Sequence, residues 1–385
     1  MLLTADTLIT GAELLRPGWI DVSGERVTAV GEGAPPRPAD RDLGPVTVLP
    51  GFVDTHTHGG GGGSFSEASV ADTAAAVALH RRHGTTTMIA SLVTSGPDEL
   101  LRQVSELAEQ VRAGLIDGIH LEGPWLATAR CGAHQPALMR DPDLDEIDRL
   151  LATAAGTIAM VTIAPERPGA LPAIRRFVDA GVVVAVGHTD ATYEQTRAAI
   201  TAGATVGTHL FNAMRPIDRR EPGPVVALIE NPAVTVELIT DGVHLDAAIY
   251  RHVTRSVGPD RVSLITDAMA ATGMPDGRYQ LGPVPVDVTG GVALVGGTDT
   301  VAGSTATMDR VVRFAAAHCG LTRDEALMLV VRQSSLNPAR ALGLSAGVLN
   351  PGAAADFVLL DSDLTVLGVM RRGAWELDPA PRSVS

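Results

Sequence analysis

The chain has 385 residues, a formal net charge of −14, 45% hydrophobic residues and only 3% aromatic residues. All 30 basic residues are arginine, because the sequence contains no lysine. This composition excludes a Walker-type phosphate loop, a Schiff-base lysine and a metal pair bridged by a modified lysine. It also argues against nucleic acid or an anionic membrane as a partner.

The two ends of the chain both read as β-rich segments. Residues 1–49 contain short strand-like runs separated by turns, and residues 347–385 contain runs such as FVLL and VLGVM. Such runs, bounded by glycine, proline and aspartate, are typical of strands. We therefore expect the two ends to pair into one small β-sandwich domain that flanks a second domain at residues 50–346.

Residues 50–346 alternate between apolar runs and helix-like stretches. Eight apolar runs lie at residues 50–56, 85–92, 117–123, 157–165, 181–188, 204–211, 234–241 and 261–268. Valine-, isoleucine- and leucine-rich runs joined by helices are typical of a parallel sheet buried on both faces. Eight such units favour a closed (β/α)8 TIM-type barrel over a doubly wound open sheet. A hairpin insert is expected near residues 278–300.

The cysteine content and the absence of targeting segments indicate a compartment. Cys131 and Cys319 are too few for a disulfide scaffold and suit a reducing cytosol. The N-terminus has no basic segment of a secretory signal, and no apolar run approaches the ~20 residues that would span a membrane. We expect a soluble, cytoplasmic protein.

Metal-competent residues follow the apolar runs, at the point where each run ends. They are His56, His58, Glu122, His188, His209, Asp241, His244 and Asp267. In a barrel these ends share one face, which is where active sites assemble. The H-x-H spacing also puts two imidazoles on one side of a strand, because side chains alternate with period 2. The sequence therefore predicts one converged cluster.

Histidine and carboxylate ligands suit zinc, iron(II), manganese or cobalt, and the absence of cysteine ligands argues against a purely structural zinc site. Glu122, His188 and His209 could hold one ion and leave a position open for water. The H-x-H pair could hold a second ion, with Glu122 or Asp267 shared. Asp267 then fits a general base that takes the water proton and later delivers it to a leaving nitrogen.

At these residues the chain resembles the amidohydrolase superfamily and, within it, the N-acetylglucosamine-6-phosphate deacetylases. The resemblance extends over essentially the full length, through PGFVDTHTHG, HLEGPW, GAHQP, VGHTDA, THLFNAM, REPG, DGVHL, TDAMAATG and VAGST. H-x-H alone indicates only the superfamily, whereas LEGPW, HLFNAM, REPG and DGVH are typical of the deacetylases. The resemblance implies hydrolysis of the acetamide of N-acetylglucosamine 6-phosphate to glucosamine 6-phosphate and acetate.

The resemblance also implies roles for individual residues. Glu122, His188 and His209 would bind the main metal, and Asp267 would be the acid/base. Substrate contacts would come from Ala133, His134, Asn212, Ala213, Arg220, His244, Val301, Ala302 and Gly303. A homodimer is implied, with Arg219 or Arg220 reaching a phosphate across the interface. Some similar deacetylases replace one or both H-x-H histidines; this chain keeps both, which favours two ions, with zinc and iron the leading candidates.

Two alternatives stay open at this point. Another amidohydrolase, such as a deaminase or a cyclic amidase, would share the metal face but would need no arginine for a phosphate. A non-catalytic scaffold on the same barrel would not need the intact cluster. The Arg220 and His244 pair favours a small anionic substrate in a chain whose bulk charge is negative, because the guanidinium fork binds phosphate well.

Overall fold

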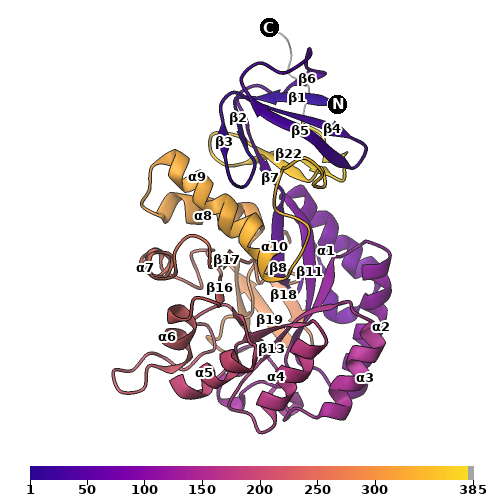
Figure 1. Cartoon of the computed structure of the whole chain (residues 1–385). Helices are drawn as coiled ribbons and strands as arrows, with labels where there is room; N and C mark the ends of the chain where they lie inside the picture. The colour runs from indigo at the N-terminus through magenta and orange to yellow at the C-terminus, as the bar shows by residue number, and fades with distance from the viewer. Residues whose placement is uncertain (380–385) are drawn as a thin grey trace.

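The computed structural model describes residues 1–379, and its centre is an eight-stranded parallel sheet (Figure 1). The strands pair in chain order, and each overlaps one of the eight predicted runs. They are β8 (Phe52–Thr57), β11 (Thr85–Leu92), β12 (Gly118–Glu122), β13 (Ile158–Ile163), β14 (Val183–Val186), β15 (Val206–Gly207), β16 (Thr235–Leu238) and β17 (Val262–Leu264).

The first and last strands meet, so that the sheet is nearly a closed barrel. The backbone N–H of Asp267 donates to the carbonyl of His56 at 2.9 Å, and the N–H of His58 donates to the carbonyl of Ala268 at 2.7 Å. Because this seam follows β17 directly, it draws Asp267 next to the H-x-H motif. The predicted TIM-type barrel is confirmed.

Helices lie around the barrel, both between successive strands and after the last strand, β17 (Figure 1). They are α1 (Val70–Arg82), α2 (Pro97–Arg112), α3 (Leu144–Ala154), α4 (Ala170–Asp179), α5 (Tyr193–Ala202), α6 (Gly223–Glu230), α7 (Ala247–Val257), α8 (Met308–His318), α9 (Arg323–Val331) and α10 (Asn337–Ala341). Local signals set their ends: Thr192 and Gln195 form a capping box before α5, and Gly203 ends it with φ 117°.

Short elements complete the connections around the barrel. They are β9 (Gly59–Gly60), β10 (Gly63–Ser64), the 3-10 turns η1 (Phe65–Glu67), η2 (Thr128–Arg130) and η3 (Pro136–Leu138), and the π-helical turn η4 (Arg332–Leu336). The β9 and β10 pair follows the H-x-H motif directly. The η2 and η3 turns belong to the loop after β12, which covers the carboxyl ends of the strands.

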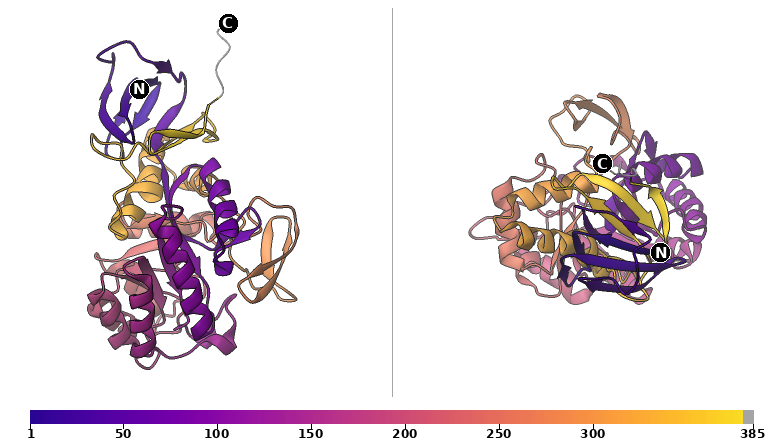
Figure 2. Two further views of the ribbon diagram at one scale, coloured as in Figure 1. Left: turned by 90° about the vertical axis from the view of Figure 1, so that its right-hand side faces the viewer. Right: turned by 90° about the horizontal axis from the view of Figure 1, so that it is seen from above.

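The two ends of the chain pair beside the barrel, as predicted. The strands are β1 (Leu2–Ala5), β2 (Thr7–Ile9), β3 (Leu14–Leu15), β4 (Gly18–Ser23), β5 (Arg26–Glu32), β6 (Arg41–Asp42), β7 (Thr47–Pro50), β21 (Phe357–Leu360), β22 (Val366–Arg371) and β23 (Ala374–Leu377). β21 pairs with β7, so one sheet mixes both ends of the chain, and β1, β4, β5 and β6 form the other. Both sheets bury side chains in one cluster, including Leu3, Ile20, Val48 and Phe357, which makes a sandwich (Figure 2).

The boundaries of the two domains stay predictions. One residue, Gly51, separates β7 of the sandwich from β8 of the barrel. The end of the predicted segment 347–385 includes residues 380–385, which lie outside the described residues. Within residues 1–379, no helix has both the length and the apolarity that crossing a membrane requires.

The predicted insert after β17 has one strand more than a hairpin. It comprises β18 (Gly277–Leu281), β19 (Val284–Thr289) and β20 (Val292–Val295), which pair antiparallel and project from the side of the barrel (Figure 2). Alternate residues of β19 are buried, and Val286 packs with Leu281, Met269 and Ala133. The insert therefore packs on the loop that follows β12.

Candidate active site

The six predicted metal and acid/base residues come together at the carboxyl ends of the barrel strands. His56 and His58 lie on β8 or directly after it, Glu122 ends β12, and His188, His209 and Asp267 follow β14, β15 and β17. All six are buried. Residues from five separate segments thus share one space.

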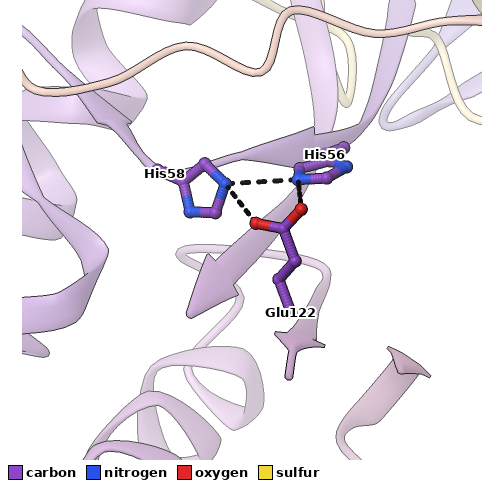
Figure 3. A group of neighbouring side chains, drawn as sticks. All are labelled: His56, His58 and Glu122. Carbon is purple, nitrogen blue, oxygen red and sulfur yellow. Dashed lines mark hydrogen bonds and ion pairs between the residues drawn. The ribbon is translucent and has the colours of Figure 1, made fainter. Parts of the chain in front are cut away.

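The H-x-H histidines, which we call the strand pair, face each other across the carboxylate of Glu122 (Figure 3). Their Nε2 atoms are 3.2 Å apart. Glu122 Oε1 lies 3.5 Å from His56 Nε2, and Oε2 lies 3.2 Å from His58 Nε2. Asp267 Oδ1 completes this group at 3.2 Å from His58 Nε2.

His188 and His209, which we call the loop pair, both contact one oxygen of Glu122, the oxygen that His56 also faces. Their Nε2 atoms are 3.1 Å apart, and both face Glu122 Oε1, at 3.1 and 2.9 Å. Both backbones are left-handed, with φ 47° at His188 and 25° at His209. Such positions strain a residue that has a Cβ and persist only where the surrounding structure holds them.

Hydrogen bonds on the outer ring nitrogens determine which way three of these histidines present their lone pairs. Nδ1 of His56 meets a carboxylate oxygen of Glu237 at 3.3 Å, and Nδ1 of His58 meets the carbonyl of Ser91 at 3.1 Å. Nδ1 of His188 meets the carbonyl of Arg130 at 2.9 Å. These oxygens only accept, so each Nδ1 donates its hydrogen and each Nε2 turns a lone pair toward the cluster.

These residues fit a divalent cation. Nε2 lone pairs from both pairs converge on an ionised carboxylate, an arrangement that repels itself unless a cation lies between them. One ligand atom each from His56, His58 and Glu122 lie within 4.8 Å of one another. The nitrogen and oxygen donors match zinc, iron, manganese or cobalt.

His134 differs from the other histidines in which ring nitrogen carries the proton. The backbone N–H of Thr94 donates to Nδ1 of His134 at 3.1 Å, so Nε2 carries the proton and points at Glu122 Oε2, 3.2 Å away. Burial, reinforced by the neighbouring His188, lowers the pKa of His134 to about 4, which keeps the ring neutral. His134 is therefore arranged to donate a hydrogen bond into the site.

A cavity of about 370 Å³ opens above the cluster. The predicted substrate residues that line it are Ala133, His134, Asn212, Ala213, His244, Val301 and Gly303. His244 is fixed by Asp241, with 2.8 Å between Nδ1 and Oδ2. Burial alone would lower the pKa of His244, but this hydrogen bond and the charge of Asp241 raise it. The wall of the cavity thus contains a histidine that protonates more readily than a free one.

Three predicted residues do not line this cavity. Ala302 is fully buried and packs with the insert instead. Arg219 and Arg220 are exposed, on the segment before α6. The sequence pattern places both arginines near the site along the chain, but their side chains do not line the cavity of their own chain.

Residues 47–375 match the amidohydrolase family. The chain belongs to this family. It is 36% identical over 371 residues to an N-acetylgalactosamine-6-phosphate deacetylase of Escherichia coli O157:H7, covering 94% of this chain and 96% of that protein. It is 40% identical over 336 residues to an N-acetylglucosamine-6-phosphate deacetylase of Danio rerio, covering 83% and 81%.

Solved structures of similar proteins agree with the fold of this amidohydrolase. N-acetyl-D-glucosamine-6-phosphate deacetylase from Mycobacterium smegmatis, as a D267A mutant in complex with N-acetyl-D-glucosamine-6-phosphate, is 70% identical, with a TM-score of 0.98. The match covers 98% of this chain and 99% of that one. N-acetylglucosamine-6-phosphate deacetylase from Thermotoga maritima is 26% identical with a TM-score of 0.88, over 98% and 99% of the two chains.

Sequence reasoning missed two residues of this amidohydrolase that contact the cluster from behind. Glu237 meets His56, and the carbonyl of Arg130 meets His188. Glu237 had a usable signal, because it is the one acid inside the apolar run VTVELIT. The contact of Arg130 had none, since any residue supplies a carbonyl. His120 on β12 contacts Ser91 Oγ at 2.9 Å and Thr162 Oγ1 at 2.8 Å.

Proposed function

We propose that this chain hydrolyses the acetamide of N-acetyl-D-glucosamine 6-phosphate to D-glucosamine 6-phosphate and acetate. The observation that carries the proposal is the histidine and carboxylate cluster beneath a cavity, in a chain 70% identical to a deacetylase structure that contains this sugar phosphate. The mutant in that structure is D267A, and Asp267 of this chain has the same type and number.

We propose that the two histidine pairs hold the metal. Glu122, His188 and His209 would hold the main ion, and the strand pair would hold a second ion with Glu122 shared. Zinc or iron is our preferred metal, with manganese and cobalt as alternatives. A bound divalent ion lowers the pKa of water at the site to roughly 7, which supplies hydroxide at neutral pH.

Asp267 and His134 are placed to move and hold protons. Asp267 Oδ1 lies 3.2 Å from His58 Nε2 and 3.5 Å from His56 Nε2, so the carboxylate stands beside the strand pair. Asp267 would take a proton from the attacking water and deliver it to the acetamide nitrogen as the C–N bond breaks. His134 Nε2–H would donate to the acetamide oxygen as negative charge develops there.

Arginine or histidine side chains must bind the phosphate, because the chain has no lysine. His244 stands at the cavity wall. Arg219 and Arg220 lie outside the cavity of their own chain, so we propose that one of them reaches the phosphate in a second copy. This requires a homodimer, which we place in the cytoplasm.

A second candidate substrate is the 4-epimer, N-acetylgalactosamine 6-phosphate. The Escherichia coli relative named for that substrate matches 94% of this chain at 36% identity. Both sugars present the same acetamide and phosphate, so the cluster would act on either one. The pocket wall around the sugar hydroxyls would decide between them.

One assay tests these candidates together. The purified protein is incubated with each 6-phosphate sugar and with unphosphorylated N-acetylglucosamine, and acetate and ammonia are measured alongside metal content. We expect acetate release with N-acetylglucosamine 6-phosphate as the preferred substrate. Ammonia release without acetate would indicate a deaminase. Metal-loaded protein that releases neither product would contradict the proposal and favour a scaffold.

A further inference from the structure

Glu237 is a carboxylate enclosed in the barrel, behind the metal cluster rather than in the cavity. It lies on β16, is 1% exposed, and does not line the cavity above the cluster. A buried carboxylate is destabilising unless it is paired and hydrogen-bonded. The carboxylate of Glu237 therefore needs hydrogen-bond partners inside the barrel.

Both oxygens of Glu237 are engaged by neighbouring residues of β8. Thr55 Oγ1 donates to Oε1 at 3.1 Å, and His56 Nδ1 lies 3.3 Å from Oε2. Thr55 and His56 are consecutive, so one carboxylate holds both the backbone segment and the ring. The remaining ring nitrogen, His56 Nε2, faces His58 and Glu122.

The outer ring nitrogens of the other three histidines do not meet a charged group in the described part of the chain. His58 and His188 donate to backbone carbonyls, and His209 Nδ1 has no partner among the described residues. Among these four histidines, and within residues 1–379, only His56 has a carboxylate at its outer ring nitrogen. A carboxylate behind a histidine fixes the tautomer and raises the basicity of the nitrogen that faces the metal.

We propose that Glu237 is a positioning residue that holds His56 as the Nδ1–H tautomer and so retains the second ion on the strand pair. The proposal rests on the metal centre proposed above. Glu237 does not contact the substrate, and its effect on the reaction passes through His56. The ion held by Glu122 and the loop pair does not depend on it.

The test is metal binding, compared between Glu237→Gln and two variants of neighbouring residues. Glutamine keeps the shape and can still accept from His56 Nδ1–H through its amide oxygen, but it removes the negative charge that raises the basicity of His56 Nε2. Thr55→Val keeps the carboxylate and removes one of its donors. Ser263→Ala is the matched control, because Ser263 is in register with Glu237, is buried, and has an unpartnered hydroxyl.

Metal-free protein is titrated with Co²⁺ and with Zn²⁺, the number of ions per chain is measured by mass spectrometry, and Co²⁺ absorption follows each site. We expect Glu237→Gln to weaken the second ion by roughly 10- to 100-fold and to leave the first unchanged. Thr55→Val should weaken it by a smaller factor, and Ser263→Ala should match wild type. Melting curves of the metal-free proteins check that each variant folds. If Glu237→Gln does not fold, the affinity of Thr55→Val for the second ion is compared with that of Ser263→Ala.

Two results would overturn the inference. One is a wild type that binds a single ion; the other is a folded Glu237→Gln, or failing that Thr55→Val, that binds two ions as tightly as wild type. The readout does not require turnover. A wild type that binds two ions but releases no acetate would contradict the proposed function and leave this test intact.

Discussion

The strand pair and the loop pair have similar geometry around Glu122 but are built in different ways. His56 lies in the six-residue strand β8, whose residues are all buried, and His58 directly follows it, so that side-chain alternation puts both on one side. His188 and His209 follow strands of four and two residues and sit in left-handed backbone. The same ligand chemistry thus arises once from a strand and once from strained turns.

The difference matches the surroundings of each pair. Behind the strand pair lie Glu237 and the carbonyl of Ser91, and Asp267 joins it from the barrel seam. The loop pair continues into the segments that line the cavity, since Arg130 contacts His188 and Asn212 follows His209 closely. We infer that the strand pair serves proton transfer and ion retention, while the loop pair couples the metal to substrate recognition.

The largest effect should come from Asp267→Asn, which removes the base beside the strand pair. We expect kcat for acetate release to fall by roughly 10²- to 10⁴-fold, the usual range for a lost general acid/base. Metal content should stay near that of wild type, because the ring nitrogens and Glu122 remain. Turnover like that of wild type would refute the acid/base role, and loss of both ions would show that Asp267 acts mainly as a ligand.

The proposed difference between the two pairs predicts that His58→Asn and His209→Asn lower kcat by different factors. We expect His209→Asn to lower kcat by ~100-fold or more, because it removes a proposed ligand of the main ion. His58→Asn should lower kcat by about tenfold, since the main ion keeps all its proposed ligands. Acetate release and metal per chain are measured on the same samples. Equal losses in both would mean that the two ions act as one unit.

Much of this site could be predicted from the sequence because strand ends in a barrel share one face. That rule was enough for Glu122, 66 residues before His188 and 87 before His209. The rule does not predict the orientation of Ala302, whose side chain packs with the insert. The sequence does not show which residue of a short loop faces the cavity. Nor could it supply the left-handed turns of the loop pair, which depend on the packing of neighbouring loops rather than on residue type.

The segment after the strand pair is held by His80, which gives a pH test. His80 on α1 is fully buried, and its Nε2 lies 2.9 Å from the carbonyl of Gly59. Burial lowers the pKa of His80 to about 4, so the folded protein holds it neutral. The stability that this provides is complete above pH 6.5, where the unfolded residue is also neutral, and is lost as pH falls toward 4.

We expect His80→Gln to flatten this dependence by roughly 2 kcal/mol between pH 7 and pH 5. Glutamine can donate to Gly59 but does not titrate. The measurement is urea unfolding of both metal-free proteins at each pH, which excludes acid release of the ions. Parallel curves for the two proteins would show that another group causes the acid sensitivity.

The smallest effect should come from Arg220→Ala, on the segment that follows the loop pair. We expect KM for the 6-phosphate sugar to rise about tenfold, the cost of one charged hydrogen bond, with little change for unphosphorylated N-acetylglucosamine. Arg219→Ala is measured beside it, because Arg219 is exposed and adjacent and is the other arginine proposed for the phosphate. Equal changes for both sugars would remove the phosphate role.

Mixed dimers then decide which chain's arginine serves a given site. In a hybrid of Arg220→Ala with Asp267→Asn, the chain that keeps Asp267 would receive Arg220 from its partner. If the arginine acts across the interface, that hybrid is active at the wild-type KM, whereas an arginine acting within its own chain leaves the hybrid at the raised KM of Arg220→Ala. A wild-type KM would mean that the loop pair of one chain and the arginine of the other recognise one substrate together, whereas the strand pair works within a single chain.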